Sequence, residues 1–475
     1  MKIQLDTFTK PKSIAVIGAT ERSGAWGSFI MENLLTCKYP GKIYPVNHRS
    51  SEVCGIPSFP NINAIQGEVD LAVIAIPEEF LEETIEACGN KGFRGIVVIT
   101  AGFSEAVKGG KEREQEIARL AHSHGMRILG PNVSGVYNLY ANFNASGTFA
   151  KHLYRSPLAA ICQGGYAIND LMVSGFSKGM GIGKFIHTGN ECDLKVSDFL
   201  EYFAEDPEIK CILLHLETLR DARRFLDVAR RATRKKPVIV HKTGRTAGGA
   251  LAASSHTGAM AGHRAIFEGA FRQANILICP SMELLLPMGH ALMERPPMRG
   301  NRVGIITMGG SWGVALTDCL EERGLKVPFL GNQLQKCLQN MGMPVRASTK
   351  NPVDIGAAGI MSFQVDTLIG MGRAILESKE VDALILHGFG RPGPIDGHES
   401  SWKGLMEMEK GVLRGFHNLE KETDLPVMLG CCLTQWESQA VGDMNDEGIR
   451  AYHRLDDLAA ILSRMYQHYA SRDRS

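Results

Sequence analysis

Short apolar runs recur along the 475-residue chain, and each is followed by a segment with helical periodicity. These runs occupy residues 14–17, 71–76, 96–99, 158–161, 211–216, 238–240, 303–306, 383–386 and 427–429. Continuous apolar runs are typical of parallel strands that are buried on both faces. Between two of them, Ala222, Phe225, Leu226 and Ala229 share one face of a helical segment, opposite its charges. The repeated order of strand, helix and strand predicts a doubly wound α/β fold.

Two polar stretches interrupt this alternation and indicate domain boundaries. One covers residues 144–157 and contains glycine and proline, and the other is the sequence ERPPMRGNR at 294–302. We therefore expect three α/β domains, at 1–145, 155–293 and 300–475. No short-period repeat is present, and no sequence identity links the second domain to the third.

Composition narrows the class of protein. Lys plus Arg number 52 and Asp plus Glu number 51, a balance that gives no electrostatic case for nucleic acid or a membrane surface. Apolar residues make up 44% and charged residues 22%, which excludes long disordered segments. The eleven cysteines are scattered, as in a reducing compartment. The polar first twelve residues do not form a signal peptide, and no apolar run reaches the ~20 residues of a membrane span. These features predict a cytoplasmic protein.

A glycine-rich turn follows the first predicted strand. A turn of this kind, from Gly18 to Gly24, opens a helix and can present backbone N–H groups to a phosphate. It departs from the dinucleotide pattern G-x-G-x-x-G because Thr20 stands at the second glycine position. Asn47 ends the second strand, where an acidic residue would hold a ribose diol. The turn therefore disfavours NAD, while a phosphate-bearing ligand and a plain packing turn both remain open.

The order of several motifs carries a family resemblance. IGAT…G, YPVN, AIP, TAGFSE and GPNVSG follow one another as in the CoA-binding domain of NDP-forming acyl-CoA synthetases, relatives of the succinyl-CoA synthetase α chain. The resemblance implies a Rossmann-like N-terminal domain whose first loop holds the CoA phosphates and whose strand ends lie along the pantetheine arm. The residues that match these motifs are Gly18, Thr20, Ser23, Gly24, Asn47, Ile76, Pro77, Thr100, Ala101 and Gly102. His48 and Arg49, which follow YPVN, are either phosphate-binding cations or solvated surface residues.

A second group of residues resembles the phosphohistidine loop of the same family. The stretch KTGRTAGGALAASSHTGAMAG is a loop of small residues around one imidazole, that of His256. The resemblance implies that His256 carries a phosphoryl group between an acyl phosphate and a nucleotide, and that Glu217, at the end of a strand, orients it. Taken without the resemblance, His256 could be a solvated loop histidine and Glu217 a helix-capping or surface residue.

A phosphoryl group also needs hydrogen-bond donors. The turn at Gly164 and Gly165 joins a strand to a helix, and its N–H groups can bind an anion. The family usually has Gln-Ser-Gly here, so Gly164 removes a hydroxyl donor. Glu191 and Met308 are two further departures, since they stand where the family has lysine and asparagine. The effect of these departures on activity is left open.

The third domain carries two further motifs of the family, and the sequence contains no motif for binding a nucleotide. TMGGSWG and NPVD resemble the last domain of the α chain in two-subunit ADP-forming acetyl-CoA synthetases, so two flavodoxin-like domains are expected after the first. The chain has no P-loop motif and no cysteine–histidine cluster with zinc spacing. The family keeps ATP and Mg²⁺ on an ATP-grasp part. The resemblance therefore implies a separate ATP-grasp β subunit, in an α₂β₂-type hetero-oligomer.

The sequence thus predicts the α subunit of an ADP-forming acyl-CoA synthetase. Such an enzyme interconverts a carboxylic acid, CoA and ATP with acyl-CoA, ADP and phosphate. A CoA-binding regulatory paralogue is one alternative, supported by the departures at Gly164, Glu191 and Met308. A Rossmann-type oxidoreductase is another, opposed by Thr20 and Asn47. The identity of the acid, the direction of the reaction and the choice between ADP and GDP cannot be predicted from these residues.

Overall fold

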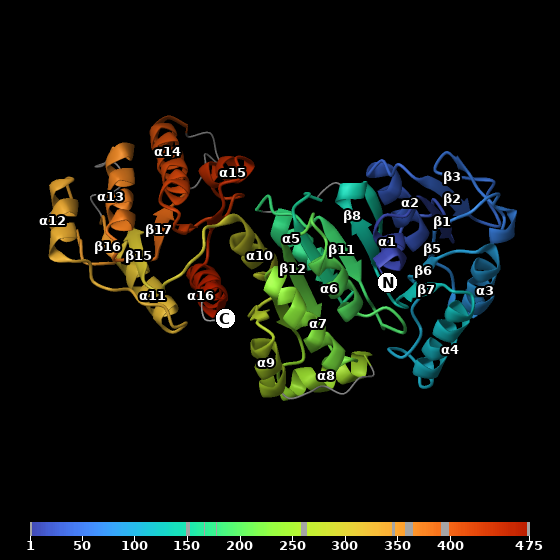
Figure 1. Cartoon of the computed structure of the whole chain (residues 1–475). Coiled ribbons are helices and arrows are strands. Elements are labelled where there is room, and N and C mark those ends of the chain that lie inside the picture. Colours follow the sequence, from blue (N-terminus) through green and yellow to red (C-terminus); the bar gives the residue numbers. More distant parts are fainter. Residues whose placement is uncertain are drawn as a thin grey trace. The chain divides into compact units, whose positions relative to one another are not determined.

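The computed structural model of the chain is built around three mainly parallel sheets, each flanked by helices, as Figure 1 shows. It describes residues 2–148, 153–165, 167–176, 178–257, 264–343, 347–356, 364–390 and 399–472. The chain divides into two compact units, one of Met1–Phe176 with Met180–Gly289 and one of Ser177–Gly179 with His290–Ser475. The predicted doubly wound α/β fold is confirmed.

The first sheet has the strand order β2-β1-β5-β6-β7, with every pair parallel. Its strands are β1 (Ser13–Ile17), β2 (Lys42–Val46), β5 (Leu71–Ile74), β6 (Gly95–Val98) and β7 (Arg127–Leu129). The other elements here are α1 (Lys2–Thr9), α2 (Trp26–Thr36), β3 (Glu52–Val53), β4 (Ile56–Pro57), η1 (Ile62–Ala64), η2 (Glu78–Phe80), α3 (Leu81–Lys91) and α4 (Gly110–Ser123). The order reverses between β1 and β5, and open α/β sheets bind ligands at such a reversal.

The second sheet has the order β14-β13-β12-β10-β11-β8-β9. Its parallel strands are β10 (Leu158–Cys162), β11 (Lys184–His187), β12 (Cys211–Leu216), β13 (Val238–Lys242) and β14 (Leu277–Ile278). An antiparallel hairpin of β8 (Gly135–Asn138) and β9 (Phe143–Ser146), joined by η3 (Leu139–Ala141), adds to the edge at β11. Residues 135–146 therefore pair with the second sheet, although the division by sequence puts most of them in the first domain. The two strands of this hairpin lack the unbroken apolar runs that identified nine of the parallel strands, and β7, β11, β14, β16 (Val353–Asp354) and β19 (Ala451–Tyr452) were missed for the same reason.

The helices of the second sheet confirm most of the predicted periodicity. They are α5 (Ala167–Phe176), α6 (Val196–Ala204), α7 (Ala222–Lys235), α8 (Ala247–Thr257), α9 (Arg264–Gln273) and α10 (Leu285–Glu294). In α7, Phe225 and Ala229 are buried as expected, but Ala222 is exposed because it is the first helical residue. Asp221 caps this helix, since its carboxylate accepts a hydrogen bond from the N–H of Arg224 at 3.2 Å.

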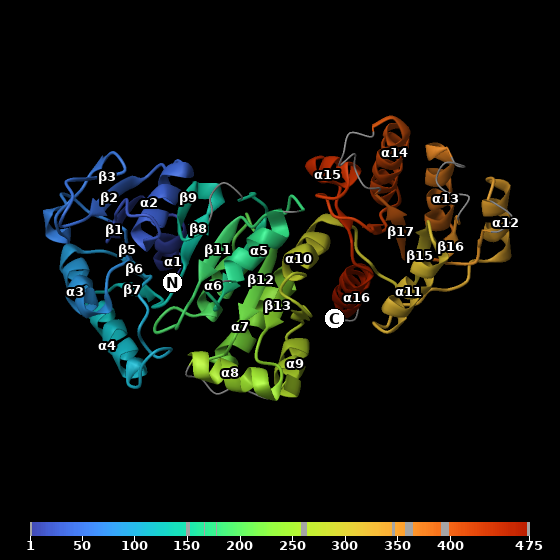
Figure 2. The same cartoon turned by 180° about the vertical axis from the view of Figure 1, so that it is seen from behind.

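One hydrophobic core runs through the first two sheets. Helix α1 lies between them, as Figure 2 shows, and contacts β6, β8 and α6. Phe8 packs edge-on against Phe199 with ring centroids 6.5 Å apart, and the hydroxyls of Thr9 and Tyr202 lie 2.8 Å apart. Asn138 of β8 donates a hydrogen bond to the carbonyl of Thr9 at 3.0 Å. These contacts hold the first two sheets in a fixed arrangement within the first unit.

The second unit contains the third sheet, with the parallel order β16-β15-β17-β18-β19. Its strands are β15 (Val303–Thr307), β16 (Val353–Asp354), β17 (Ala383–Phe389), β18 (Val427–Cys431) and β19 (Ala451–Tyr452). Its helices are α11 (Gly310–Glu321), α12 (Asn332–Asn340), α13 (Val365–Glu377), α14 (Glu399–Thr423), α15 (Gln439–Asp446) and α16 (Leu455–Arg472). Among the described residues, no helix combines the length and the hydropathy that a membrane crossing requires.

Candidate functional site

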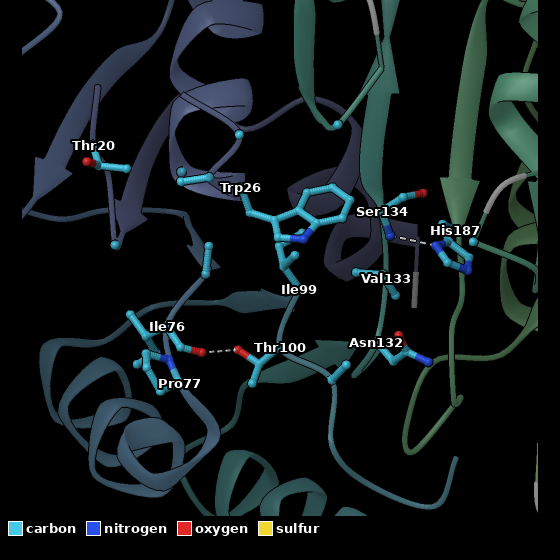
Figure 3. Close-up of a pocket in the computed structure, with 18 of the residues that line it drawn as sticks. Thr20, Trp26, Ile76, Pro77, Ile99, Thr100, Asn132, Val133, Ser134 and His187 are labelled. Atoms are coloured by element: carbon cyan, nitrogen blue, oxygen red, sulfur yellow. Dashed lines mark hydrogen bonds between the residues drawn. The ribbon is translucent and has the colours of Figure 1, made fainter. Parts of the chain in front are cut away.

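A cavity of about 700 Å³ opens at the carboxyl ends of β1, β5 and β6 and reaches the second sheet. Figure 3 shows its walls, with Thr20, Ile76, Pro77 and Thr100 on one side and His187 on the other. Of the ten residues predicted to bind CoA, seven line this cavity: Gly18, Thr20, Gly24, Ile76, Pro77, Thr100 and Ala101. Gly165, predicted to bind phosphate, also lines it. One residue of the second predicted group therefore borders the same cavity as the first group, while Gly164 and Glu217 are not among its lining residues.

Three of the predicted residues are placed behind or beside the cavity wall. Asn47 donates a hydrogen bond to the carbonyl of Ala19 at 2.8 Å and so supports the glycine turn. The N–H of Gly102 donates to the Glu105 carboxylate at 2.7 Å. Ser23 lies in the same turn as Gly24, outside the residues that line the cavity.

The glycine turn is built from close backbone approaches. Gly18 has a φ of +90°, and a Cβ there would lie 2.3 Å from the carbonyl oxygen of Ala75. A Cβ on Gly27 would lie 2.0 Å from the carbonyl oxygen of Gly18. Only glycine therefore fits at either position. The helix that follows starts at Trp26 after Ala25, a cap residue whose side chain makes no hydrogen bond to the first turn. This helix start can offer its N–H groups to an anion.

Several residues that line the cavity were not predicted. Arg22 belongs to the glycine turn and adds a positive charge. The indole of Trp26 lies across the cavity in Figure 3 and packs on Gly147, where a Cβ would come within 2.3 Å of the ring. Asn132, Val133 and Ser134 belong to the GPNVSG motif, which was noted without a role. His48 and Arg49 are exposed and hydrogen-bonded to each other at 3.0 Å, away from these lining residues.

His187, also unpredicted, lies at the junction of the two sites. The N–H of Ser134 donates to its Nδ1 at 2.6 Å, a bond drawn in Figure 3. Because Nδ1 accepts, the proton is on Nε2, which donates to the carbonyl of Gln163 at 2.7 Å. Burial lowers the pKa of His187 to about 4, so the ring is neutral at physiological pH. No sequence motif marks this histidine, because its partners come from distant segments.

Gln163 links the turn after β10 to the turn after β12. Its Oε1 accepts hydrogen bonds from the N–H groups of Glu217 and Thr218 at 2.8 and 3.0 Å. Its Nε2 donates to Glu191 at 3.1 Å, and that carboxylate also accepts the N–H of Val196. Glu191 is buried, and burial raises its pKa. The family departure at Glu191 therefore supplies a buried acceptor that fixes Gln163.

Glu217 and Gly164 lie against each other. A Cβ on Gly164 would lie 2.8 Å from Oε1 of Glu217 and 3.0 Å from Nε2 of His215. A side chain at residue 164 would therefore displace the carboxylate of Glu217 from its present position. Lys242 donates to the carbonyl of Glu217 at 2.6 Å, and burial lowers the pKa of this lysine to about 8, against the opposing effect of the Glu217 charge.

The structure corrects the prediction of a loop around His256. Residues Ala247–Thr257 form helix α8, which begins after Thr246. The Thr246 hydroxyl accepts the N–H of Gly249 at 3.1 Å, as a capping residue does. Alanines, the strongest helix formers, are frequent here, which explains the helix. The side chain of His256 and residues 258–263 lie outside what the structure describes, so the pairing of His256 with Glu217 stays a prediction.

The two motifs of the third domain have packing roles. Met308 is buried in the core of the second unit, and a Cβ on Gly388 would lie 2.8 Å from the Cβ of Met308. Asn351 accepts the N–H of Ile305 at 2.9 Å and donates to the carbonyl of Val303 at 3.0 Å. In the described part of the chain, no group of three or more His, Cys, Asp or Glu residues could hold a metal ion.

Comparison with known proteins gives a consistent result. A CoA binding domain family matches residues 12–138, and the succinyl-CoA ligase like flavodoxin domain family matches residues 155–292. The chain is 36% identical to the acetate–CoA ligase [ADP-forming] II subunit alpha of Pyrococcus furiosus, over 98% of this chain and 97% of that protein. It is 38% identical to the acetate–CoA ligase [ADP-forming] of Methanocaldococcus jannaschii, but spans only 49% of that longer protein.

A solved structure supports the same assignment over the whole length. The dinucleotide-forming acetyl-coenzyme A synthetase 1 of Ca. Korarchaeum cryptofilum, in complex with phosphate and ADP, is 33% identical with a TM-score of 0.85, and the match covers 100% of both chains. The fold and the two family matches define a protein with a CoA binding domain followed by a flavodoxin domain of the succinyl-CoA ligase type. The chain belongs to the family of ADP-forming acetate–CoA ligases, in which it corresponds to an α subunit. The predicted family and fold class are confirmed.

Proposed function

We propose that this chain is the CoA-binding and phosphoryl-carrying subunit of an ADP-forming acid–CoA ligase. The reaction interconverts a carboxylic acid, CoA and ATP with acyl-CoA, ADP and phosphate. One observation carries the proposal: a single cavity is lined by the turn at Gly18 on one sheet and by Gly165 and His187 on the next. A thiol bound along the first sheet can thus meet a phosphate bound at the second.

The cavity has the size and the lining that CoA requires. Its volume of about 700 Å³ is within the 300–1,000 Å³ typical of ligand pockets. We assign the CoA phosphates to the turn around Thr20 and Gly24, where the helix start and Arg22 supply positive potential. The pantetheine arm then follows Ile76, Pro77 and Thr100. Thr100 donates its hydroxyl hydrogen to the carbonyl of Ile76 at 2.8 Å, which joins these two strand ends.

The phosphoryl step is assigned to the edge of the second sheet. In the direction of ATP formation, a neutral imidazole nitrogen of His256 attacks the phosphorus of an acyl phosphate. The N–P bond forms, the P–O bond to the acyl group breaks, and the carboxylate leaves. The phosphohistidine then gives its phosphoryl group to ADP. The turn at Gly164 and Gly165 holds the phosphoryl oxygens through backbone N–H groups, and Glu217 orients the imidazole.

We assign ATP and Mg²⁺ mainly to a separate ATP-grasp β subunit, in an α₂β₂-type assembly. Two full-length relatives are named as alpha subunits, which supports the existence of a partner chain. The Methanocaldococcus jannaschii ligase, about twice as long as the matched region, is consistent with a fused form of the same arrangement.

The departures from the family pattern do not favour a regulatory paralogue. Gly164 gives room to Glu217 and His215, Glu191 is a buried acceptor, and Met308 belongs to a hydrophobic core. Each departure has a packing partner in this chain, so none of them requires the loss of activity.

The proposal is tested by the phosphorylation of His256. The chain, combined with its β subunit and incubated with labelled ATP and Mg²⁺, should gain an acid-labile and base-stable phosphoryl group. His256→Ala should abolish both labelling and turnover, because His256 is the proposed phosphoryl carrier, and His263→Ala should retain both. CoA affinity, measured by calorimetric titration, should stay the same. Near-normal turnover of His256→Ala would refute the phosphohistidine mechanism.

A further inference from the structure

Two buried histidines next to the phosphate-binding turn have no role in the mechanism above. His215 of β12 and His241 of β13 are register partners on neighbouring parallel strands. Their rings stack with centroids 5.3 Å apart and planes 21° apart, and their Nδ1 atoms lie 3.2 Å apart, within hydrogen-bond distance. Only 7% of His215 and 8% of His241 is exposed. Burial of two polar rings side by side is costly unless their hydrogen bonds are used.

The second nitrogen of His215 points at the turn. Nε2 lies 3.0 Å from the place that a Cβ on Gly164 would occupy, and Oε1 of Glu217 lies 2.8 Å from the same place. Within the described part of the chain, Nε2 has no hydrogen-bond partner. A ring nitrogen of a buried histidine therefore lies next to the position of the missing side chain.

The protons on the two rings can be assigned. Burial lowers the pKa of His215 to about 3 and that of His241 to about 4, so each ring is neutral and carries one proton. The Nδ1–Nδ1 bond requires one donor and one acceptor. If His215 donated, its Nε2 would be bare next to the same turn position that the Glu217 carboxylate borders, which brings a lone pair into the neighbourhood of a negative charge. The reverse assignment avoids this repulsion: His241 donates from Nδ1, and His215 accepts at Nδ1 and keeps its proton on Nε2.

We propose that His241 and His215 form a relay of fixed tautomers that presents the Nε2–H of His215 to a phosphoryl group in the Gly164–Gly165 turn. His215 is then the donor that touches the phosphoryl oxygen, and His241 is a positioning residue. The inference rests on the proposed function, since that function supplies the phosphoryl group. The relay also supplies the hydrogen-bond donor that Gly164 lacks, because the Nε2–H of His215 takes the place of a side-chain hydroxyl at residue 164.

Paired amide variants test the donor. Asn reaches the position of Nδ1 but not that of Nε2, whereas Gln places an N–H close to Nε2. Loss of a single oxyanion donor costs about 10²–10³ in one enzyme, and with backbone donors still present we expect His215→Asn to slow His256 phosphorylation at least ~10-fold. His215→Gln should stay within ~3-fold of the unsubstituted chain, because a charge-assisted hydrogen bond is retained. Phosphorylation is measured in single-turnover experiments with the β subunit and labelled ATP.

His387 gives a matched control. It occupies the same register position on β17 of the third sheet and is also buried, at 2% exposure. His387→Asn and His387→Gln should leave the phosphorylation rate unchanged. Equal rates for His215→Asn and His215→Gln would overturn the relay, as would a His215→Asn chain that phosphorylates at the normal rate.

The tautomers can be measured without the partner. Long-range ¹H–¹⁵N correlation spectra of the isolated chain with ¹⁵N-labelled histidine separate Nδ1–H from Nε2–H rings, and the two variants assign the signals. We expect Nε2–H for His215 and Nδ1–H for His241, and the opposite pattern would overturn the proposal. If the unsubstituted chain acquires no phosphoryl group, the proposed function fails while this spectrum still decides the relay.

Discussion

The five parallel strands of the second sheet have the same order as the five strands of the third sheet, but the two sheets carry different residues at the carboxyl ends of these strands. In the second sheet, His215 of β12 pairs with Cys162 on one side and with His241 on the other. In the third, His387 of β17 pairs with Thr307 and with Gly430. His215 stacks on a second imidazole, whereas His387 fills the space left by Gly430, where a Cβ would lie 2.5 Å from its ring. The same residue type thus serves a polar cluster in one sheet and packing in the other.

The neighbouring positions extend this difference. Glu217 follows His215 by two residues, and the equivalent position after His387 is Phe389, which is fully buried. The residue directly after the first strand is Gln163 in the second sheet and Met308 in the third. Trp312 packs edge-on against His387 with ring centroids 5.3 Å apart. The doubly wound topology gives the second and third sheets similar carboxyl-end edges. Only the residues at the edge of the second sheet make it a candidate site.

The largest effect on the difference between the two sheets is expected when the negative charge of Glu217 is removed. Glu217→Gln keeps a hydrogen-bonding side chain but loses the negative charge that orients an imidazole. Loss of an orienting carboxylate costs about 10⁴ in the serine-protease case, and we expect a loss of ~10³-fold in turnover here. Steady-state rates of acyl-CoA formation with the β subunit measure it. Phe389→Leu, at the equivalent position of the third sheet, should lower the melting temperature because it leaves a cavity in a hydrophobic core, and it should leave turnover within ~2-fold.

A smaller effect is expected from a side chain at the glycine turn. Gly164→Ser places a Cβ 2.8 Å from Oε1 of Glu217 and 3.0 Å from Nε2 of His215, so that the carboxylate must move and the imidazole must give slightly. We expect phosphorylation of His256 to slow by ~10-fold with CoA affinity unchanged, since the strain is of the order of 1–3 kcal/mol. Gly309→Ser, at the equivalent turn of the third sheet, should not affect phosphorylation.

The double variant Gly164→Ser/His215→Ala sharpens this test. Removal of the imidazole makes room for the serine, and a serine hydroxyl can donate to the phosphoryl group in place of Nε2–H. The two changes should therefore be less damaging together than the sum of each alone, a coupling that a double-mutant cycle measures. Strict additivity would show that Gly164 and His215 act independently.

The fold was readily predicted because its signal is local. Apolar runs such as 211–216 correspond exactly to a buried strand, β12 (Cys211–Leu216). Family motifs pointed to seven residues of one cavity, because Gly18, Ile76 and Thr100 follow strand ends that a parallel sheet brings to the same edge. The hairpin at 135–146 was missed, since its short edge strands carry no comparable run.

The histidine cluster could not be predicted for a different reason. His187, His215 and His241 stand on three strands, and only the register of the sheet brings His215 beside His241. In the sequence, His215 stands within the apolar run 211–216, His241 directly follows the run 238–240, and His187 belongs to none of these runs. The role of Glu191 could not be predicted either. Its carboxylate accepts hydrogen bonds from Gln163 and Val196, and these contacts exist only in the folded chain.

The smallest predicted effect is on stability and concerns Lys242, a buried charge of the second sheet that has no counterpart in the third sheet. Lys242 ends β13, and the equivalent position of β18 is Cys431. Burial lowers the pKa of Lys242 from its ordinary value near 10.5 to about 8. The folded chain therefore releases this proton at a lower pH than the unfolded chain does. Between these two values the unfolded state binds more protons, so stability must rise with pH.

Lys242→Met removes this contribution, and its effect should change with pH. The melting temperature of the variant should exceed that of the unsubstituted chain by the largest amount near pH 7.5. At this pH the unsubstituted chain is destabilised by its buried ammonium group. This advantage should shrink as the pH rises toward 10, because the native lysine is then neutral. Calorimetric scans at pH 7.5, 8.5 and 9.5 measure the difference, and Cys431→Ala should shift all three scans by a similar amount. Parallel curves for Lys242→Met would mean that the lysine is already solvated in the folded chain, and that the two sheet edges differ less in charge than their residues indicate.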